Sequence, residues 1–479
     1  MTLWTAEAAR EATGGAGPGG WTASGVSIDT RSLEPGDLFV ALTDRRDGHE
    51  FVGAGFAAGA AAALVSRVPE GVTGPCLVVP DVLEGLRGLA RAARARTRAK
   101  VIGITGSVGK TGTKEMLRAA LAPQGRVHAA ERSFNNHWGV PLTLARMPAE
   151  SDFAVIEIGM NAPGEIAPLS RLARPDAAMI TTVAAVHMEA FESLAGIARE
   201  KSGIFAGLAP GGTAILNRDI GTYAIQHRGA RAAGARLIRF GARGRPEFRL
   251  RGVTVTETAT AIEARVRGRP LLFKLGAPGR HLALNALAAL AAVEAVGGDL
   301  ARAAMALGQW RAPEGRGARL CIALGDEALD GEILLIDESY NANPASMEAA
   351  LDLLAVAEPR DDVGRVPTGR RVAFLGDMLE LGRDEAAMHA ALAALPAMAR
   401  IDRVHCAGPL MRHLHDALPR RLRGLWCADA ATLAAEARRL VDAGDVVMVK
   451  GSNGSRIAQV VDRVRALGEV RGPGADEGG

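Results

Sequence analysis

The run Gly106-Ser107-Val108-Gly109-Lys110-Thr111-Gly112 carries the residue types that hold a phosphate group. The glycines allow backbone N–H groups to point into a loop, and the lysine adds a full positive charge. The threonine hydroxyl is a ligand for the Mg²⁺ that accompanies nucleotide phosphates. The loop is short, because the strict phosphate-loop pattern has a glycine five residues before the Gly-Lys pair, where this chain has Ile104. We therefore predict nucleotide phosphate binding at a shortened loop.

Two further side chains follow predicted buried strands. Glu157 ends the apolar run 153–157, and His187 comes four residues after the run 177–183. Ligands of open α/β sheets sit at the carboxyl ends of the strands, so we expect Thr111, Glu157 and His187 to share one crevice. Oxygen and imidazole ligands suit a divalent cation that holds phosphates. Taken singly, His187 also fits a helix cap and Glu157 a salt-bridge partner.

Several elements must position these groups. An apolar run at 101–104 predicts a strand before the loop, and 113–121 predicts a helix after it. The polar stretch 134–141 predicts a loop over a site. Lys201 falls on the predicted helix 194–205, where the residues alone favour a solvated surface lysine. Asn285 interrupts the apolar face of a long Ala/Leu helix, which indicates a specific contact.

The length and the order of the predicted elements indicate three domains in an α/β protein. A chain of 479 residues exceeds what one hydrophobic core supports. We predict a small α/β domain at 1–98, a central phosphate-loop domain with a mainly parallel sheet at 99–315, and a third domain at 316–479. In the third, strands alternate with helices as in a doubly wound, Rossmann-like parallel sheet. The tail from about Val470 is predicted to be disordered.

Composition excludes several classes of protein. Apolar residues make up 48% of the chain, aromatic residues 4%, and the net charge is +4. With no basic stripe interleaved with aromatic residues, we expect no nucleic acid partner. Four scattered cysteines without a CxxC pair predict a reducing compartment and no zinc site. No signal sequence or membrane span is predicted, so we expect a cytoplasmic protein, with peripheral membrane association left open.

Four stretches together resemble one known family. They are Asp29-Thr30-Arg31 with the following 35–42, the short phosphate loop, Tyr340-Asn-Ala-Asn-Pro344, and 375–382. The chain resembles the Mur ligases, the ATP-dependent amide-forming enzymes of bacterial cell-wall synthesis. Within that family it is most similar to the members that add D-alanyl-D-alanine to a UDP-linked muramoyl tripeptide. The tetrapeptide Asp-Asn-Pro-Arg, typical of the members that add a diamino acid, does not occur in this chain.

The resemblance implies a mechanism and its catalytic residues. ATP would phosphorylate the terminal carboxylate of UDP-N-acetylmuramoyl-tripeptide, and the amine of D-alanyl-D-alanine would attack the acyl phosphate. The implied catalytic residues are Lys110, Glu157, His187 and Lys201. Two Mg²⁺ ions are implied, the first held by Thr111 and Glu157 and the second by His187 and a carbamoylated Lys201. A monomer is expected.

The resemblance also implies contacts to the two nucleotides. ATP would be held by the loop Gly106–Gly112 and by a second group of residues: Asn285, Arg316, Asp337 and Asn341. The UDP-linked substrate would be held by a third group: Ile28, Thr30, Arg45, Arg46, Asn135 and Asn136. Two positions depart from the family pattern: Glu338 stands where many members have a second aspartate, and Gly203 where many have a glutamate.

Two other interpretations remain open at this point. The first is another amide ligase of the same fold, such as the diamino-acid-adding ligase or a folylpolyglutamate synthase. The folate enzyme would not need a uridine-nucleotide domain ahead of its phosphate loop. The second is a nucleotide-dependent switch or motor, which the short loop disfavours because such proteins carry the full-length loop.

Overall fold

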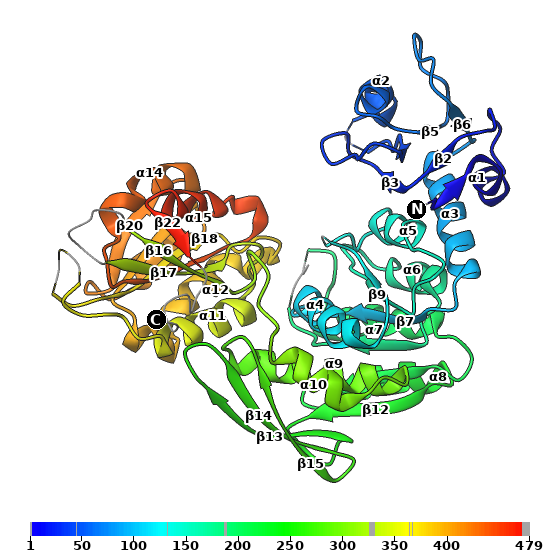
Figure 1. The fold of residues 1–479 in the computed structure, drawn as a ribbon. Helices are drawn as coiled ribbons and strands as arrows, with labels where there is room; N and C mark the ends of the chain where they lie inside the picture. The colour runs from blue at the N-terminus through cyan, green and yellow to red at the C-terminus, as the bar shows by residue number, and fades with distance from the viewer. Residues whose placement is uncertain are drawn as a thin grey trace, which may run out of the picture.

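The computed structural model describes residues 2–44, 46–131, 133–185, 189–324, 331–363, 365 and 367–471. Over these residues the chain forms three main sheets, each within one of three successive units (Figure 1). The N-terminal unit adjoins the central unit, and the C-terminal unit lies to its other side. The prediction of an α/β protein with parallel-sheet domains is confirmed. None of the helices in the described part of the chain has the length and apolarity that a membrane crossing requires.

The N-terminal unit is a small parallel sheet in the order β3-β4-β5-β6, with helices around it. Thr5 caps its first helix by accepting a hydrogen bond from the Ala8 N–H. The indole of Trp4 donates to the carbonyl of Ala145 at 2.9 Å, which ties this unit to the central one. Its elements are β1 (Trp4–Thr5), α1 (Ala6–Thr13), β2 (Thr22–Ala23), β3 (Gly25–Ser27), β4 (Asp37–Val40), η1 (Gly48–Phe51), α2 (Val52–Ala57), β5 (Ala62–Val65), β6 (Cys76–Val78) and α3 (Val82–Arg96).

The central unit is built on a sheet in the order β15-β14-β13-β12-β11-β10-β7-β9-β8. From β8 to β13 neighbouring strands pair in parallel, and β13, β14 and β15 add an antiparallel meander. Its strands are β7 (Lys100–Thr105), β8 (Val127–Ala129), β9 (Phe153–Glu157), β10 (Ala177–Ile180), β11 (Thr213–Asn217), β12 (Arg236–Gly241), β13 (Phe248–Val255), β14 (Thr260–Val266) and β15 (Arg269–Leu275). Its helices are α4 (Lys110–Leu121), η2 (Ala122–Gln124), α5 (Gly139–Ala145), α6 (Ile166–Ala173), α7 (Leu194–Ser202), η3 (Gly203–Gly207), α8 (Tyr223–Ala232), α9 (Arg280–Ala295) and α10 (Leu300–Leu307).

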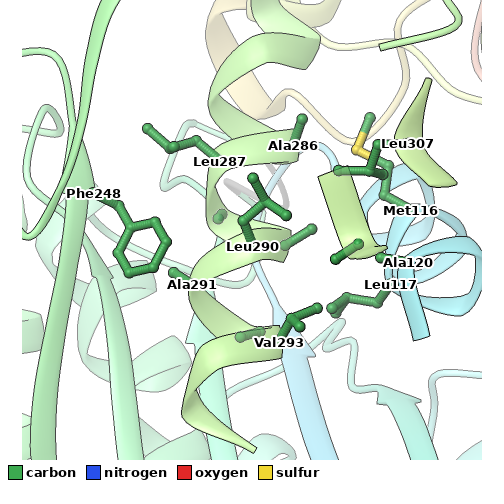
Figure 2. Packing of buried hydrophobic residues seen from close by; sticks show 14 of the residues in the cluster. Met116, Leu117, Ala120, Phe248, Ala286, Leu287, Leu290, Ala291, Val293 and Leu307 are labelled. Atoms are coloured by element: carbon green, nitrogen blue, oxygen red, sulfur yellow. The ribbon is translucent and has the colours of Figure 1, made fainter. Parts of the chain in front are cut away.

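Helix α9 is the centre of the largest core cluster. Alanine and leucine favour the helix, and the small alanines allow its neighbours to approach closely. Leu287, Leu290 and Val293 are fully buried, together with Met116 and Leu117 of α4 (Figure 2). Because α4 follows directly on the glycine loop, this packing fixes the loop relative to α9.

The C-terminal unit contains a sheet in the order β20-β19-β18-β21-β17-β16-β22. Strands β17 to β21 pair in parallel, and β16 pairs antiparallel with β17 and β22. Its strands are β16 (Ala318–Ala323), β17 (Glu332–Glu338), β18 (Arg371–Gly376), β19 (Arg403–Ala407), β20 (Arg423–Cys427), β21 (Val446–Lys450) and β22 (Glu469–Arg471). Its helices are α11 (Pro344–Val356), η4 (Gly382–Asp384), α12 (Glu385–Ala391), η5 (Leu392–Ala394), η6 (Pro396–Arg400), α13 (Met411–Ala417), α14 (Ala430–Leu440), η7 (Asn453–Ser455) and α15 (Ala458–Arg465).

The prediction of disorder from Val470 is wrong for the first two residues of that tail. Val470 and Arg471 belong to β22 and pair with Ile322 and Cys321 of β16. The N–H and C=O groups on the outer side of β16 attract a further strand, which local composition does not reveal. Residues 472–479 lie outside the described residues.

Candidate functional site

The glycine loop runs from the end of β7 to the start of α4, and two of its glycines are required. Gly106 has φ of 156° and Gly109 has φ of 85°, which side-chain-bearing residues rarely adopt. A Cβ on Gly106 would lie 1.9 Å from Oγ1 of Thr181. The Thr181 hydroxyl donates to the carbonyl of Val108 at 2.6 Å, so the end of β10 fixes the loop from the side.

Ser107 fastens the loop to the same neighbouring segment. Its N–H donates to the carbonyl of Thr182 at 2.9 Å. Its hydroxyl donates to the carbonyl of Ala184 at 3.1 Å and accepts from the Ala184 N–H at 3.0 Å. The loop conformation is therefore set before any ligand binds.

Lys110 folds back over the loop, where its Nζ donates to the carbonyl of Gly106 at 2.8 Å. Burial lowers the pKa of this lysine, and the nearby positive charge of Arg316 lowers it further, while Glu157 raises it. Among the described residues, Arg316 and Lys201 thus both place positive charge near Lys110, and Glu157 and Glu200 place negative charge in the same region. That balance favours an anion such as a phosphate.

Thr111 and Glu157 are in direct contact. The Thr111 hydroxyl donates to Oε2 of Glu157 at 2.8 Å, and the Asn135 amide donates to Oε1 at 2.8 Å. Glu157 is only 2% exposed. A hydroxyl and a carboxylate oxygen fit Mg²⁺, which binds proteins through one or two oxygen ligands plus substrate phosphates. The metal-binding roles of both residues stay predictions.

Ser133 completes this contact and was missed by sequence reasoning. Its Oγ lies 2.8 Å from Oγ1 of Thr111 and accepts a hydrogen bond from Nη2 of Arg316 at 3.0 Å. The polar stretch predicted as a loop over a site began at Phe134, one residue later. A serine close to two asparagines is a common loop composition, so the pattern gave no reason to single out Ser133.

Lys201 is buried, so the surface interpretation favoured by the residues alone is wrong. The residue is 2% exposed at the end of α7. Among the described residues, no hydrogen bond or ion pair holds its amine. Burial lowers the pKa of Lys201 well below its ordinary value, Lys110 lowers it further, and Glu200 raises it. The chain therefore carries a poorly solvated amine near the phosphate loop.

His187 lies outside the described residues, so its predicted place in the crevice stays a prediction. Within the described ranges, no group of three or more His, Cys, Asp or Glu side chains could hold a metal ion. The predicted set relies instead on a threonine, a glutamate, a histidine and a modified lysine.

Asn285 reaches the loop from α9. A Cβ on Gly109 would lie 2.7 Å from Nδ2 of Asn285, so the amide borders the phosphate loop directly. Arg316, in the segment before β16, lies with its guanidinium carbon 4.0 Å from the centre of the Tyr340 ring. Both predicted nucleotide contacts therefore border one region, from two different units.

Asp337 and Asn341 form hydrogen bonds within the C-terminal unit. Oδ2 of Asp337 accepts from the Gly315 N–H at 2.8 Å, and Oδ1 accepts from the Ser339 hydroxyl at 2.6 Å. The carbonyl of Asn341 accepts from Nζ of Lys450 at 2.9 Å. In this arrangement the Asp337 carboxylate holds the segment that leads to Arg316.

A cleft of about 830 Å³ lies beside the N-terminal sheet. Ile28, Thr30 and Arg46 line it, as do His137 and Trp138 from the central unit. Arg45 lies outside the described residues. The cleft thus contains three of the residues predicted to bind the UDP-linked substrate.

The Asp47–His49 pair in the same cleft forms structural contacts. Oδ1 of Asp47 accepts from the backbone N–H of His49 at 3.0 Å and caps η1. Nδ1 of His49 lies 2.6 Å from the same oxygen, and its Nε2 accepts from the Ser66 N–H at 2.9 Å. These contacts show Asp47 capping the turn that leads into η1.

Asn136 lies in the loop just before α5, and its side chain is bonded to the first residue of that helix. Its Oδ1 accepts from the Gly139 N–H at 2.8 Å. Helix α5 begins at Gly139, so the predicted loop 134–141 ends three residues early. Asn135 and Asn136 both have bonded side chains, and their predicted substrate contacts stay predictions.

Comparison with known proteins shows the family. Residues 104–293 match the Mur ligase middle domain and residues 326–453 match the Mur ligase glutamate ligase domain. The chain is 37% identical, over 94% of both chains, to the UDP-N-acetylmuramoyl-tripeptide–D-alanyl-D-alanine ligase of Escherichia coli.

Solved structures agree with this match. The structure of MurF from Acinetobacter baumannii has a TM-score of 0.81 at 27% identity and covers 97% of this chain and 99% of its own. MurF of Thermotoga maritima in complex with ADP shares the fold, with a TM-score of 0.75 at 24% identity, covering 92% of this chain and 97% of its own. The chain belongs to the Mur ligase family.

Proposed function

We propose that the chain is an ATP-dependent ligase that joins D-alanyl-D-alanine to UDP-N-acetylmuramoyl-tripeptide through a new amide bond. The observation that carries the proposal is the Thr111–Glu157 contact beside Lys110 at the glycine loop. Relatives named for that activity support it, because they match this chain over 91% to 94% of its length.

The first chemical step activates the terminal carboxylate of the peptide. Its oxygen is a poor leaving group, and phosphorylation converts it into phosphate, which leaves readily. The terminal carboxylate of the peptide attacks the γ-phosphorus of ATP, the bond to the bridging oxygen breaks, and ADP leaves. In this proposal Lys110 and free N–H groups of the loop balance the charge on the transferring phosphoryl group. Mg²⁺, held by Thr111 and Glu157, would neutralise phosphate charge when bound.

The second step forms the amide. The neutral amine of D-alanyl-D-alanine attacks the carbonyl carbon of the acyl phosphate, inorganic phosphate leaves, and the amine nitrogen loses its extra proton. The proposed ATP contacts come from two units, the loop from the central unit and Arg316 from the C-terminal unit. We therefore expect the C-terminal unit to close on the nucleotide and to bring the amine close to the acyl phosphate.

Carbamoylation of Lys201 belongs to the same proposal. Carbon dioxide reacts only with a neutral amine; a nitrogen–carbon bond forms, one proton leaves, and an anionic carbamate results. The burial of Lys201 and its lowered pKa favour the neutral amine that this reaction requires. The carbamate oxygens would then face the positive charge of Lys110 and, with His187, hold a second Mg²⁺.

The two nucleotides are assigned to separate places. ATP would lie along Gly106–Gly112, with Asn285 and Arg316 beside it and with Asp337 and Asn341 behind them. UDP would occupy the N-terminal cleft between Thr30 and Arg46. We expect the reaction to take place in the cytoplasm, with the chain acting as a monomer.

A substrate panel tests the proposal against the diamino-acid-adding alternative. UDP-linked tripeptide and dipeptide are each offered with D-alanyl-D-alanine or free diamino acid, and phosphate release is measured. We expect release only with tripeptide plus D-alanyl-D-alanine. Release with dipeptide plus diamino acid would assign the chain to the alternative.

A further inference from the structure

Ser133 lies between the C-terminal unit and the predicted cation site. Its Oγ is 3.0 Å from Nη2 of Arg316 and 2.8 Å from Oγ1 of Thr111. Thr111 in turn contacts Oε2 of Glu157 at 2.8 Å. A guanidinium and a carboxylate are thus joined by two hydroxyl groups in series.

The number of hydrogens on each group fixes which group donates in each of these hydrogen bonds. The carboxylate of Glu157 only accepts, so the single hydroxyl hydrogen of Thr111 points to it. The hydroxyl of Ser133 must then donate to Thr111, and its oxygen accepts from Arg316, which only donates. Every hydrogen bond therefore points from the guanidinium of Arg316 toward the carboxylate of Glu157. Hydrogen bonds in such a series polarise and strengthen one another.

Charge repulsion opposes the Arg316–Ser133 contact when Mg²⁺ is bound at Thr111 and Glu157. Mg²⁺ at Thr111 and Glu157 would place two positive charges close to the guanidinium of Arg316, which already lies near Lys110. Phosphates would at the same time offer Arg316 a stronger, bidentate partner. Arg316 would therefore leave Ser133 when nucleotide and cation arrive.

We infer that Ser133 is a positioning residue, which holds Arg316 against the cation site while the site is free of nucleotide and releases it when Mg²⁺-nucleotide binds. The inference rests on the proposed nucleotide site and adds its regulation. The contact stabilises the nucleotide-free form and keeps the C-terminal unit docked. Within the C-terminal unit, the Tyr340 ring lies 4.0 Å from the guanidinium carbon of Arg316 and favours the position from which Arg316 reaches Ser133.

The test compares Ser133→Ala with Ser133→Thr, which keeps the hydroxyl. Titration calorimetry with ADP is done once with Mg²⁺ and once with EDTA. Because the alanine variant lacks a contact that stabilises only the free form, its Mg²⁺-ADP affinity should rise about three- to tenfold. The apparent KM for ATP should fall with little change in kcat, and Ser133→Thr should behave as wild type.

X-ray scattering of the nucleotide-free proteins gives a second readout. Ser133→Ala should have a larger radius of gyration than wild type, because the C-terminal unit loses a contact to the central unit. Arg465→Ala is the matched control, since it removes a surface ion pair with Glu314 at 3.2 Å in the same linking region. It should leave both the scattering and the ADP affinity unchanged.

Two results would overturn the inference. Weaker binding of Mg²⁺-ADP by Ser133→Ala, with unchanged binding in EDTA, would make Ser133 a cation ligand instead. Unchanged affinity and scattering would make the contact incidental. If wild type binds no ADP at all, the proposed function fails, and the scattering comparison alone decides the role of Ser133.

Discussion

The hydroxyl of Thr111 lies 2.8 Å from Oε2 of Glu157, although 46 positions of the sequence separate the two residues. Thr111 comes from the first turn of α4 and Glu157 from the end of β9. The pairing of β7 with β9 places both at one edge of the sheet. This contact brings together a hydroxyl and a carboxylate, the two ligands predicted for a phosphate-bound cation.

Glu157→Gln tests this pair. Removing the negative charge should lower phosphate release by roughly 10²-fold or more and raise the Mg²⁺ concentration needed for half-maximal rate. The measurement is a Mg²⁺ titration of phosphate release. Glu150→Gln, on an exposed turn, is the matched control. Equal Mg²⁺ dependence in all three proteins would remove Glu157 from the cation site.

Lys110→Ala removes the charge that we propose lies beside the transferring phosphoryl group. We expect phosphate release to fall by roughly 10²- to 10³-fold, because the variant loses the amine that bonds to the carbonyl of Gly106 in the loop. Steady-state assays with saturating substrates measure the loss. Lys274→Ala, an exposed position of β15, should retain full activity. Near-normal turnover of Lys110→Ala would exclude the proposed role.

Lys201→Ala tests the carbamate. Activity should fall severely, and short-chain carboxylates added to the assay should restore part of it by supplying the missing anionic oxygens. A loss that no carboxylate restores would favour a purely structural role, and full activity without any addition would show that the amine is dispensable. The rate is followed by phosphate release over a range of carboxylate concentrations.

Lys201 also predicts a pH-dependent stability. Below the lowered pKa of Lys201 in the folded state, the amine is charged in both states, and the destabilisation of the folded chain by the buried ammonium is at its maximum. As the pH rises from there toward the ordinary value of 10.5, the native amine is neutral while the unfolded one is still charged. Unfolding then takes up a proton, so stability rises with pH.

Lys201→Met should therefore be more stable than wild type, with a difference that shrinks as the pH rises. Urea unfolding in buffers depleted of carbon dioxide measures this difference. Carbamoylation must be absent in this experiment, because the carbamate would replace the ammonium. A stability difference that stays constant across the pH series would contradict the buried-amine explanation.

Gly106→Ala tests the loop geometry. The added Cβ would meet Oγ1 of Thr181 at 1.9 Å, at a φ of 156° that alanine rarely adopts. We expect ADP affinity to fall by at least tenfold, because the loop must move to relieve the clash. Gly112→Ala, where the added Cβ meets no atom within 4 Å, is the steric control within the same loop. Equal affinity in both variants would show that the loop adapts freely.

The sequence by itself determined the loop, the order of the elements and the family. Gly106, Gly109 and Lys110 lie within a few residues of one another, so local spacing is enough to predict an anion site. Strands ending in Glu157 and Asp337 could be read from apolar runs that stop at a carboxylate. These features depend on backbone preferences and periodicity, which act over short distances along the chain.

Only the tertiary structure decided the burial of Lys201, the place of Ser133 and the last strand. A lysine on a short helix is exposed in most contexts, whereas Lys201 is buried on a helix against which α6, α8 and η3 pack. Ser133 matters through Thr111 and Arg316, which lie 22 and 183 residues away in the sequence. Val470 pairs with β16 across an edge that no local pattern marks. In each case the deciding neighbour is distant in sequence, and its position is fixed only when the sheets and α9 have packed.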